Sequence, residues 1–324
     1  MKRHFLKQLA VLAAACLAAP LVSAQANYPD RPIRFIVPFP PGASVDPIAR
    51  VVGQKLGEVL GQTIIVDNRP GGNMAIGAGF VAKAAPDGYN LLFTALATHV
   101  IHTMQTSLPY DSIKDFAPIS MVSRSAYMMA IHTSVPAKTM PEFVAYAKAN
   151  PGKLNFGSSG VGNLNHLAVE LFNLRAGTKI VHVPYKGGSQ ALQDLITGRV
   201  QVMISNVPVL QPQVDAGNLR ALAYTSQAKG GPVVPTFTQL GFPDLDAIES
   251  LNVLMAPAGT PEPIIAKLNA ALQKVLTMPD VITAIENQKQ TVVYSTSALL
   301  GERMRSDRAK YAEILDKANI KLTP

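Results

Sequence analysis

The stretch from Phe35 to Gly61, FIVPFPPGASVDPIARVVGQKLGEVLG, decides the fold. It begins as a short apolar strand, turns through two prolines and a glycine, and continues as a helix with apolar residues at helical spacing. The prolines stiffen the turn, Gly42 lets the backbone approach another group closely, and Pro47 suits the first helical turn, with Ser44 or Asp46 as cap. A strand that leads directly into a helix is typical of parallel α/β folds.

The same alternation recurs along the chain. Short runs rich in Val and Ile predict strands within residues 33–39, 63–68, 89–95, 154–159, 180–185, 200–206 and 219–226. Between them, apolar stripes predict helices over the segments 48–60, 164–172 and 265–276. The pattern predicts an α/β protein with mostly parallel sheets flanked by helices.

Two segments resemble each other, SAYMMAIHTSVPAKTMPEFVAYAK (125–148) and SLNVLMAPAGTPEPIIAKLNAAL (250–272). Each reads as a strand, a Pro-rich turn and a helix, and together they bracket the middle third of the chain. We interpret them as the places where the backbone crosses between two lobes. Residues 27–125 and 250–324 would form lobe 1, and residues 126–249 lobe 2. A single continuous sheet with two similar edge units is the alternative.

The first 26 residues predict a signal peptide. Lys2, Arg3 and Lys7 precede the apolar run LAVLAAACLAAPLV, and Ala24 and Ala26 fit a cleavage site. We therefore expect an exported, periplasmic protein cut near Ala26. A membrane anchor is disfavoured because the apolar run is short of the roughly 20 residues that span a bilayer. The single cysteine, Cys16, lies inside the leader, so the mature chain has no disulfide; lipid attachment at Cys16 is a weaker alternative.

Composition excludes several classes of function. The net charge of +8 falls to +5 without the leader. The chain has no Lys/Arg block with interleaved aromatic residues, so we do not expect it to bind nucleic acid. No later segment approaches 18 consecutive apolar residues, so we expect no direct membrane insertion. In any transport role, another chain would form the pore.

Three junctions between a strand and a helix share one construction. The first is the turn at Gly42. The second, NFGSSGVGNLNHLAVELF (155–172), has three glycines around two serines. The third, VPYKGGSQALQDLITG (183–198), has Gly187 and Gly188 before Ser189 as cap, and Gly198 at the far end of the helix. Such helix starts favour an anion. In open α/β folds they meet at the carboxyl ends of the strands. Ordinary α/β loops with capping residues are the alternative for each one.

Other chemistries fit less well. The first strand is followed by one glycine where a dinucleotide site needs three, and no phosphate-loop motif is present. His99 and His102 lack an acidic neighbour, so we interpret them as loop or surface residues and expect no metal. Ser158 or Ser159 with His166 or His182 could form a hydrolase site, although GSSGV is not a nucleophile elbow. His166 lies opposite the apolar stripe of its helix, which favours a solvated ring or one that faces the cleft, and His182 alternates with valines and should be packed.

At these loops the sequence resembles the substrate-binding receptors of tripartite tricarboxylate transporters, the Bug family. The resemblance rests on YPDRPIRFIVPFPPGASVD, NRPGGNMAIGAGFVAKAAPDGYNLLF, LPYDSIKDFAPIS, PAKTMPEFVAYAKANPGKLNFGSSGVGNLNHLAVELF, HVPYKGGSQALQDLITG and APAGTPEPIIAKLN, which cover nearly the whole chain. It implies a two-lobed periplasmic binding protein of the second type that closes on a small carboxylate without a cofactor.

The resemblance also implies which residues line the ligand site. They are Phe39, Pro40, Gly42, Ala43, Ser44, Val45 and Asp46 in the first loop, Thr94 and Ala95, Ser158, Ser159, Gly160, Gly162 and His166, Tyr185 and Lys186, and Ser205 and Asn206.

Three positions depart from the family pattern. Ala43 replaces a usual glycine, Ile101 to Thr103 replace a common Asn-Pro, and Ser205 replaces a frequent Asp. We infer a pocket that prefers a purely anionic ligand to one bearing an ammonium group.

The expected protein is a monomeric receptor that delivers an organic acid to the membrane permease subunits of a tripartite transporter. A ligand sensor that docks on a sensor kinase, and a secreted serine hydrolase, are the alternatives.

Overall fold

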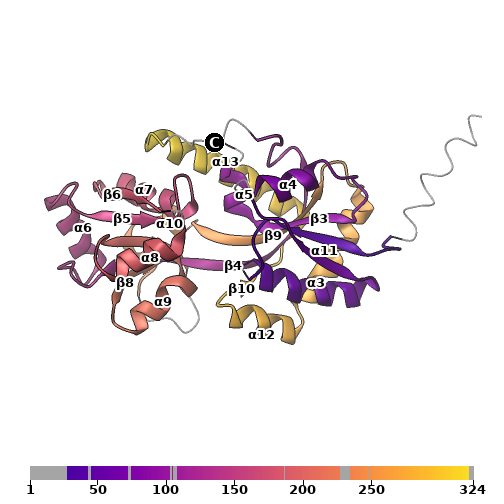
Figure 1. Ribbon diagram of the computed structural model, residues 1–324, viewed down its shortest axis with the longest axis horizontal. Helices are drawn as coiled ribbons and strands as arrows, with labels where there is room; N and C mark the ends of the chain where they lie inside the picture. Colours follow the sequence, from indigo (N-terminus) through magenta and orange to yellow (C-terminus); the bar gives the residue numbers. More distant parts are fainter. Residues whose placement is uncertain are drawn as a thin grey trace, which may run out of the picture.

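The computed structural model describes residues 28–42, 45–71, 74–102, 104, 108–185, 187–226, 234–246 and 248–320. The chain folds into two α/β lobes that are joined side by side (Figure 1). The predicted signal peptide lies outside the described residues, so its cleavage near Ala26 stays a prediction.

Lobe 1 is built on the sheet that begins with the decisive stretch. Strand β1 (Ile33–Val37) pairs in parallel with β2 (Ile64–Asn68) and β3 (Asn90–Ala95). The sheet continues with β9 (Glu249–Pro257), β4 (Phe116–His132) and β10 (Thr291–Val292), which are all antiparallel to their neighbours. The three strands predicted in this part of the chain are confirmed.

Lobe 2 repeats this plan. Strand β5 (Asn155–Ser158) pairs in parallel with β6 (Val181–Pro184) and β7 (Val202–Asn206). The second half of β4 and β8 (Leu219–Tyr224) complete the sheet in antiparallel pairing. The two-lobed α/β fold is therefore confirmed with one correction: the sheets are mixed instead of mostly parallel, because β4 and β9 add antiparallel partners to both parallel units.

The long strand β4 connects the lobes. It pairs with β9 from Phe116 to Ala126 and with β7 from Tyr127 onward, so its partner changes between adjacent residues. One strand thus belongs to both sheets, and the ten strands form one connected network. The predicted lobe boundaries, at 125/126 and 249/250, lie beside this change of partner and stay a prediction.

Helices cover both faces of each sheet (Figure 1). They are α3 (Asp46–Leu60), α4 (Ala75–Ala82), α5 (Leu96–His102), α6 (Met140–Ala149), α7 (Leu164–Ala176), α8 (Gly188–Ile196), α9 (Val207–Asp215), α10 (Pro243–Asp246), α11 (Glu262–Leu276), α12 (Pro279–Asn287) and α13 (Ser297–Lys317), with a short 3₁₀ turn, η1 (Thr238–Leu240). The predicted stripes of α7 and α11 are fully buried. In α3, Ile48, Val52 and Leu56 are buried and the other three stripe residues are partly exposed.

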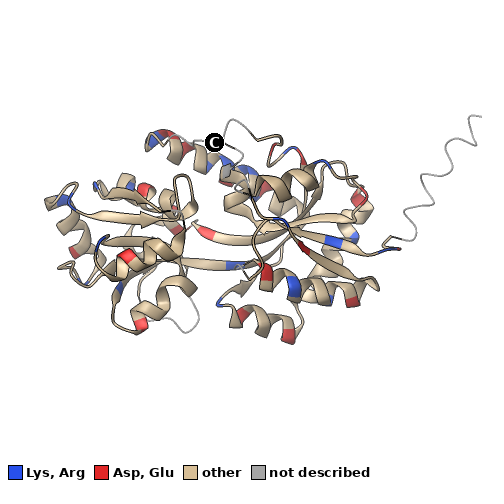
Figure 2. Ribbon diagram, viewed as in Figure 1, with Lys and Arg blue, Asp and Glu red and all other residues tan. Residues whose placement is uncertain are grey.

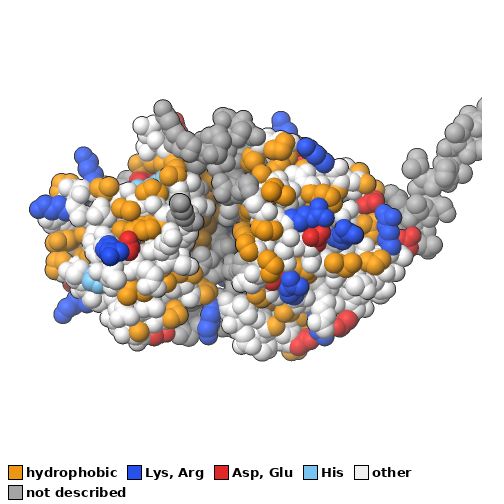
Figure 3. Space-filling model, in the orientation of Figure 1, with side chains coloured by type: hydrophobic (Ala, Val, Ile, Leu, Met, Phe, Trp, Pro, Cys, Tyr) orange, Lys and Arg blue, Asp and Glu red, His pale blue; other side chains and the backbone are white. Residues whose placement is uncertain are grey.

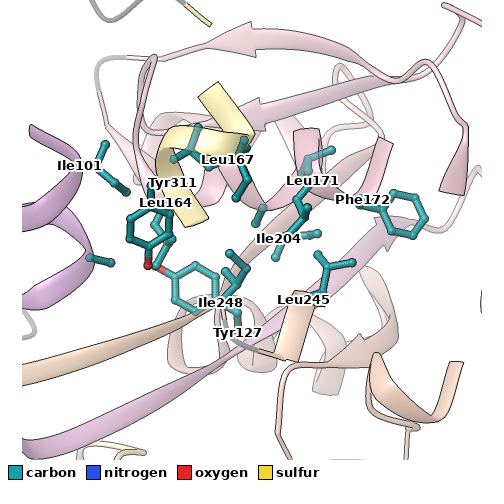
Figure 4. Packing of buried hydrophobic residues seen from close by; sticks show 14 of the residues in the cluster. Ile101, Tyr127, Leu164, Leu167, Leu171, Phe172, Ile204, Leu245, Ile248 and Tyr311 are labelled. Atoms are coloured by element: carbon teal, nitrogen blue, oxygen red, sulfur yellow. The ribbon is translucent and has the colours of Figure 1, made fainter. Parts of the chain in front are cut away.

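The hydrophobic core continues from one lobe into the other. One buried cluster lies under α3 and α11 in lobe 1 and another under α8 and α9 in lobe 2. The largest cluster contains residues of both lobes, bridged by α13 (Figure 4). In it, Tyr311 of α13 packs with Ile101 of lobe 1 and Leu164 of lobe 2. The C-terminal helix therefore bridges the lobes on one side of β4.

Charges of both signs are scattered over both lobes, without a single-sign patch in this view (Figure 2). Within the described part of the chain, no helix is long and apolar enough to cross a bilayer.

Candidate functional site

Strand register places the loops of the two lobes opposite each other. Ala95 ends β3 and is paired with Asn252, which is paired with Ser123 of β4. Asn206 ends β7 and is paired with Tyr127 of β4. Ser123 and Tyr127 are four residues apart, or about 13 Å along a strand. Because β3 and β7 run toward each other, the carboxyl ends of both parallel units face one furrow between the lobes (Figure 3).

Four helices begin at these strand ends. Helices α3, α7, α8 and α9 follow β1, β5, β6 and β7, and none has a side-chain hydrogen bond at its N-cap. By contrast, the side chains of Thr139 and Thr296 cap α6 and α13. Helices α11 and α12, which do not follow these parallel strands, also lack a side-chain cap. The first N–H groups of an uncapped helix carry partial positive charge and can donate hydrogen bonds to an anion.

The first loop is held by Asp46. Its carboxylate accepts hydrogen bonds from the Gly42 N–H at 2.9 Å, from Asn68 Nδ2 at 2.9 Å and from Arg50 Nε at 3.1 Å. Burial alone would raise the pKa of Asp46, but the bonds from Arg50, Gly42 and Asn68 outweigh it and lower the pKa. Asp46 is buried and fully engaged, which favours a role in shaping the loop over direct contact with a ligand.

The predicted cap of α3 is corrected by this geometry. The N-cap is Val45, and Asp46 is the first helical residue. Phe39 is partly exposed, and Pro40 and Gly42 are exposed. Gly42 has φ +80° with open space around it, so the turn needs a glycine there. Ala43 and Ser44 lie outside the described residues.

The second loop is also braced from within. Ser158 Oγ lies 3.1 Å from the Gly160 carbonyl and 2.5 Å from His182 Nε2. Ser159 Oγ donates to Asn165 Oδ1 at 3.0 Å, and Asn163 Nδ2 donates to the Ser159 carbonyl at 2.9 Å. The side chains thus fix the loop, while residues Ser159 and Gly160 stay partly exposed.

The prediction of a solvated His166 is wrong. The ring is 3 % exposed and stacks on His182, with 3.7 Å between the ring centroids. Helical spacing places His166 opposite the apolar stripe, but strand β6 brings His182 over that side of the helix. His182 is partly buried and packed against Phe156, as its alternation with valines predicts.

The third loop differs from the prediction in its cap. Helix α8 begins at Gly188 with Gly187 as N-cap, so Ser189 lies inside the helix. Gly198 has φ +76° and ends the helical segment as expected. Tyr185 Oη donates to Asp194 at 2.7 Å, and burial together with that carboxylate raises the pKa of Tyr185 to about 12. Lys186 lies outside the described residues.

The remaining predicted residues lie at the strand ends. Thr94 and Ala95 end β3 and are buried, and Thr94 Oγ1 points to Met74 Sδ at 3.8 Å. Ser205 is 6 % exposed, and Asn206 beside it is partly exposed. The register above brings Ala95 and Asn206 to the two sides of the furrow. Their contact with a ligand stays a prediction.

Sequence reasoning missed the residues that organise these loops: Arg50, Asn68, Asn163 and Asn165. Arg50 carried a signal, because it follows Asp46 by four residues on a helix. The Asn-x-Asn pair in GVGNLNH also carried one, because Asn is frequent at helix starts. Asn68 carried none, because it comes from a neighbouring strand.

Among the described residues no group of three His, Cys, Asp or Glu side chains could hold an ion. His99 was predicted on a loop or the surface, but it is buried in α5, with Nε2 3.1 Å from the Ser112 carbonyl and its ring against Phe116. The side chain of His102 lies outside the described residues.

The chain matches the family described as the tripartite tricarboxylate transporter family receptor over residues 48–320. It is 36% identical to the protein BugT of Bordetella pertussis over 315 residues, 96% of this chain and 96% of BugT. A Rhodopseudomonas palustris structure with adipate is 29% identical, with a TM-score of 0.76 over 90% of this chain and 99% of that one. MatC of the same organism with bound malate is 28% identical, with a TM-score of 0.72 over 89% of this chain and all of MatC.

Proposed function

Because this chain belongs to the receptor family of tripartite tricarboxylate transporters, we propose that it captures a small organic carboxylate between its lobes and delivers it to a membrane permease. The family is one of periplasmic solute-binding receptors and not of enzymes. We also propose that the signal peptide is removed near Ala26 and that the mature protein acts as a monomer.

The observation that carries this proposal is the strand register. The carboxyl ends of β3 and β7 lie only four residues of β4 apart, and the uncapped helices α3 and α7 follow the adjacent strands β1 and β5. A carboxylate bound between them would accept N–H bonds from two separate bodies. Closure would then strengthen each bond, because the site loses water and its effective dielectric constant falls. No covalent step is required.

Two similar proteins have been solved with dicarboxylates, adipate and malate. They make these acids the first probes for this chain. The described residues of the three predicted loops include no Arg or Lys side chain at the strand ends, and Lys186 of the third loop lies outside them. We propose that helix N–H groups contribute to the anion recognition. The predicted preference for a purely anionic ligand over an amino acid is tested with the same probes.

The test is native mass spectrometry of the mature protein for a co-purified acid, followed by thermal shift with malate, adipate and their amino-substituted analogues. Saturation at about 100 times the dissociation constant adds roughly 2.7 kcal/mol of stability. The matching diamides, which keep the size but lose the charge, are the control. A melting temperature unmoved by every acid, with no co-purified ligand, would reject the proposal. Uptake of the bound acid by cells with and without this protein separates delivery from sensing.

One contact favours a second function. Ser158 Oγ and His182 Nε2 are 2.5 Å apart, which is the spacing of a nucleophile and its base. Ser158 is fully buried, and among the described contacts of His182 no carboxylate orients the ring. Hydrolysis of an ester panel that disappears in Ser158→Ala would establish the hydrolase; absence of turnover in the wild type removes it.

A further inference from the structure

Two imidazole rings lie directly behind the second loop. His166 of α7 and His182 of β6 are stacked, with ring centroids 3.7 Å apart and planes at 11°. The Phe156 ring of β5 packs against both, with its centroid 4.8 Å from that of His182 and 5.9 Å from that of His166. The His166 ring is 3 % exposed. Such a pair is unusual, because histidine brings a titratable group into an otherwise apolar packing layer.

Both ends of the loop from Ser158 to Gly162 rest on this stack. The Gly162 N–H donates to His166 Nδ1 at 3.0 Å, so the proton of the neutral ring is on Nε2. At the other end, Ser158 Oγ contacts His182 Nε2. Between them Gly160 has φ +127° and Gly162 has φ +78°, conformations that side-chain-bearing residues rarely adopt.

We propose that His166 in its neutral form is a positioning residue for this loop, and that protonation of its ring weakens ligand binding. A proton on Nδ1 would point at the Gly162 N–H, so two donors would face each other and the bond that fixes the glycine would be lost. The loop would relax where α7 begins. This inference rests on the proposed function, because it takes the loop to be part of the ligand site.

The surroundings of His182 oppose positive charge on that ring. Burial, and next to it the His166 ring, lower the pKa of His182 to about 4, and Glu170 acts weakly in the opposite direction. Glu170 Oε1 lies 3.7 Å from His166 Nε2, on the side away from Gly162. Among the described residues, His182 from β6 and Glu170 from α7 are the titratable groups recorded against His166, and β5 contributes only the apolar Phe156. Because Nε2 already carries the proton of the neutral ring, an added proton goes to Nδ1 and breaks the bond to the loop.

The first readout needs no ligand. In ¹⁵N-labelled full-length mature protein, the amide resonance of Gly162 should move with pH in step with the His166 imidazole, and amide exchange there should accelerate in acid. His166→Asn keeps an acceptor oxygen near the Nδ1 position but does not titrate, so its Gly162 amide should stay constant over the same range. A Gly162 amide that ignores the imidazole in the wild type overturns the proposal.

The second readout is affinity, measured by calorimetry at pH 7.5 and 5.0 with malate or adipate, whichever raises the melting temperature more. In the wild type the dissociation constant should rise about tenfold, the equivalent of one lost hydrogen bond. In His166→Asn the rise should shrink to the part that comes from titration of the acid itself, which is the same for both proteins. His166→Leu, without an acceptor, should bind weakly at both pH values.

The matched control is His132, whose Nδ1 also accepts a backbone N–H, from Ser134 at 3.2 Å, at the far end of β4. His132→Asn should leave the wild-type pH profile unchanged. Parallel pH profiles for the wild type and His166→Asn would overturn the proposal even if His166→Leu fails to fold. If neither acid binds, the proposed function fails, while the Gly162 amide still decides whether His166 positions the loop.

Discussion

Replacing Asp46 by Asn tests whether this residue builds the first loop. Asp46 is 4 % exposed, and its carboxylate accepts bonds from Gly42, Arg50 and Asn68. Asn keeps one acceptor oxygen and adds two N–H donors. Since all three partners are donors, at least one of them must lose its bond, and the Arg50 guanidinium loses its counter-charge.

The size of the effect follows from these contacts. A hydrogen bond to a charged group contributes about 1.5–3 kcal/mol. The Arg50 side chain is 51 % exposed and can hydrate, so its loss lies at the low end. We expect Asp46→Asn to lower the free energy of unfolding by about 2 kcal/mol. In a protein of this size that corresponds to a melting temperature about 3 °C lower. Affinity for the carboxylate probe should fall as well, because Gly42 is no longer fixed.

Glu58→Gln is the control, since it changes the same charge on the same helix. Glu58 pairs with Lys55 at the surface and is 51 % exposed, so we expect a loss below about 0.5 kcal/mol. Chemical denaturation and calorimetry of both variants measure the difference. Equal stability of Asp46→Asn and the wild type at pH 7 would refute the reasoning.

The pH dependence provides a second check. The pKa of Asp46 is lowered from its ordinary value of 3.8, so its stabilisation is complete above 3.8 and is lost as pH falls through the lowered value. The gap between the wild type and Asp46→Asn should therefore be constant near neutral pH and close in strong acid.

Three further predictions concern stability. Tyr311→Phe should leave the free energy of unfolding unchanged or raise it by up to about 1 kcal/mol, because the buried hydroxyl has no partner among the described residues. A clear fall in that free energy on urea denaturation would show that the hydroxyl makes a stabilising hydrogen bond. Gly88→Ala should cost about 3 kcal/mol, since φ is +82° and a Cβ would lie 2.6 Å from Ile264, whereas Gly61→Ala, at φ +71° in open space, should cost about 1 kcal/mol. The pKa of His182 is lowered to about 4, so between pH 6.5 and 4 the unfolded chain binds a proton that the folded chain does not. The free energy of unfolding should therefore fall on acidification by at most about 1.4 kcal/mol per pH unit. Denaturation midpoints measured against pH should show this slope in the wild type and lose it in His182→Gln.

Local patterns in the sequence were sufficient to predict the strands. Each of the seven predicted strands is confirmed, because apolar runs bounded by Gly, Pro and polar residues leave few alternatives for the backbone. Antiparallel partners were harder to predict. Strand β4 pairs with β7, β8, β9 and β10, and no periodicity within residues 116–132 tells which distant segments lie beside it.

In the candidate site, too, local features could be predicted and contacts between distant segments could not. Gly and Pro at strand ends identified the three loops, because turn geometry is local. The burial of His166 and the bond from Asn68 to Asp46 depend on residues brought from β6 and β2, which spacing along one helix does not reveal.

The polar side chains of the motifs therefore act on the loops themselves. Asp46 binds Gly42, Ser159 binds Asn165, and Ser158 contacts His182. Among the described residues of these loops, the backbone N–H groups at the starts of α3 and α7 are donors that a carboxylate could use. Affinity should then depend on how well the loops are held more than on any one side chain touching the acid. On this basis, conservative substitutions behind the loops should change affinity as much as substitutions on their exposed faces.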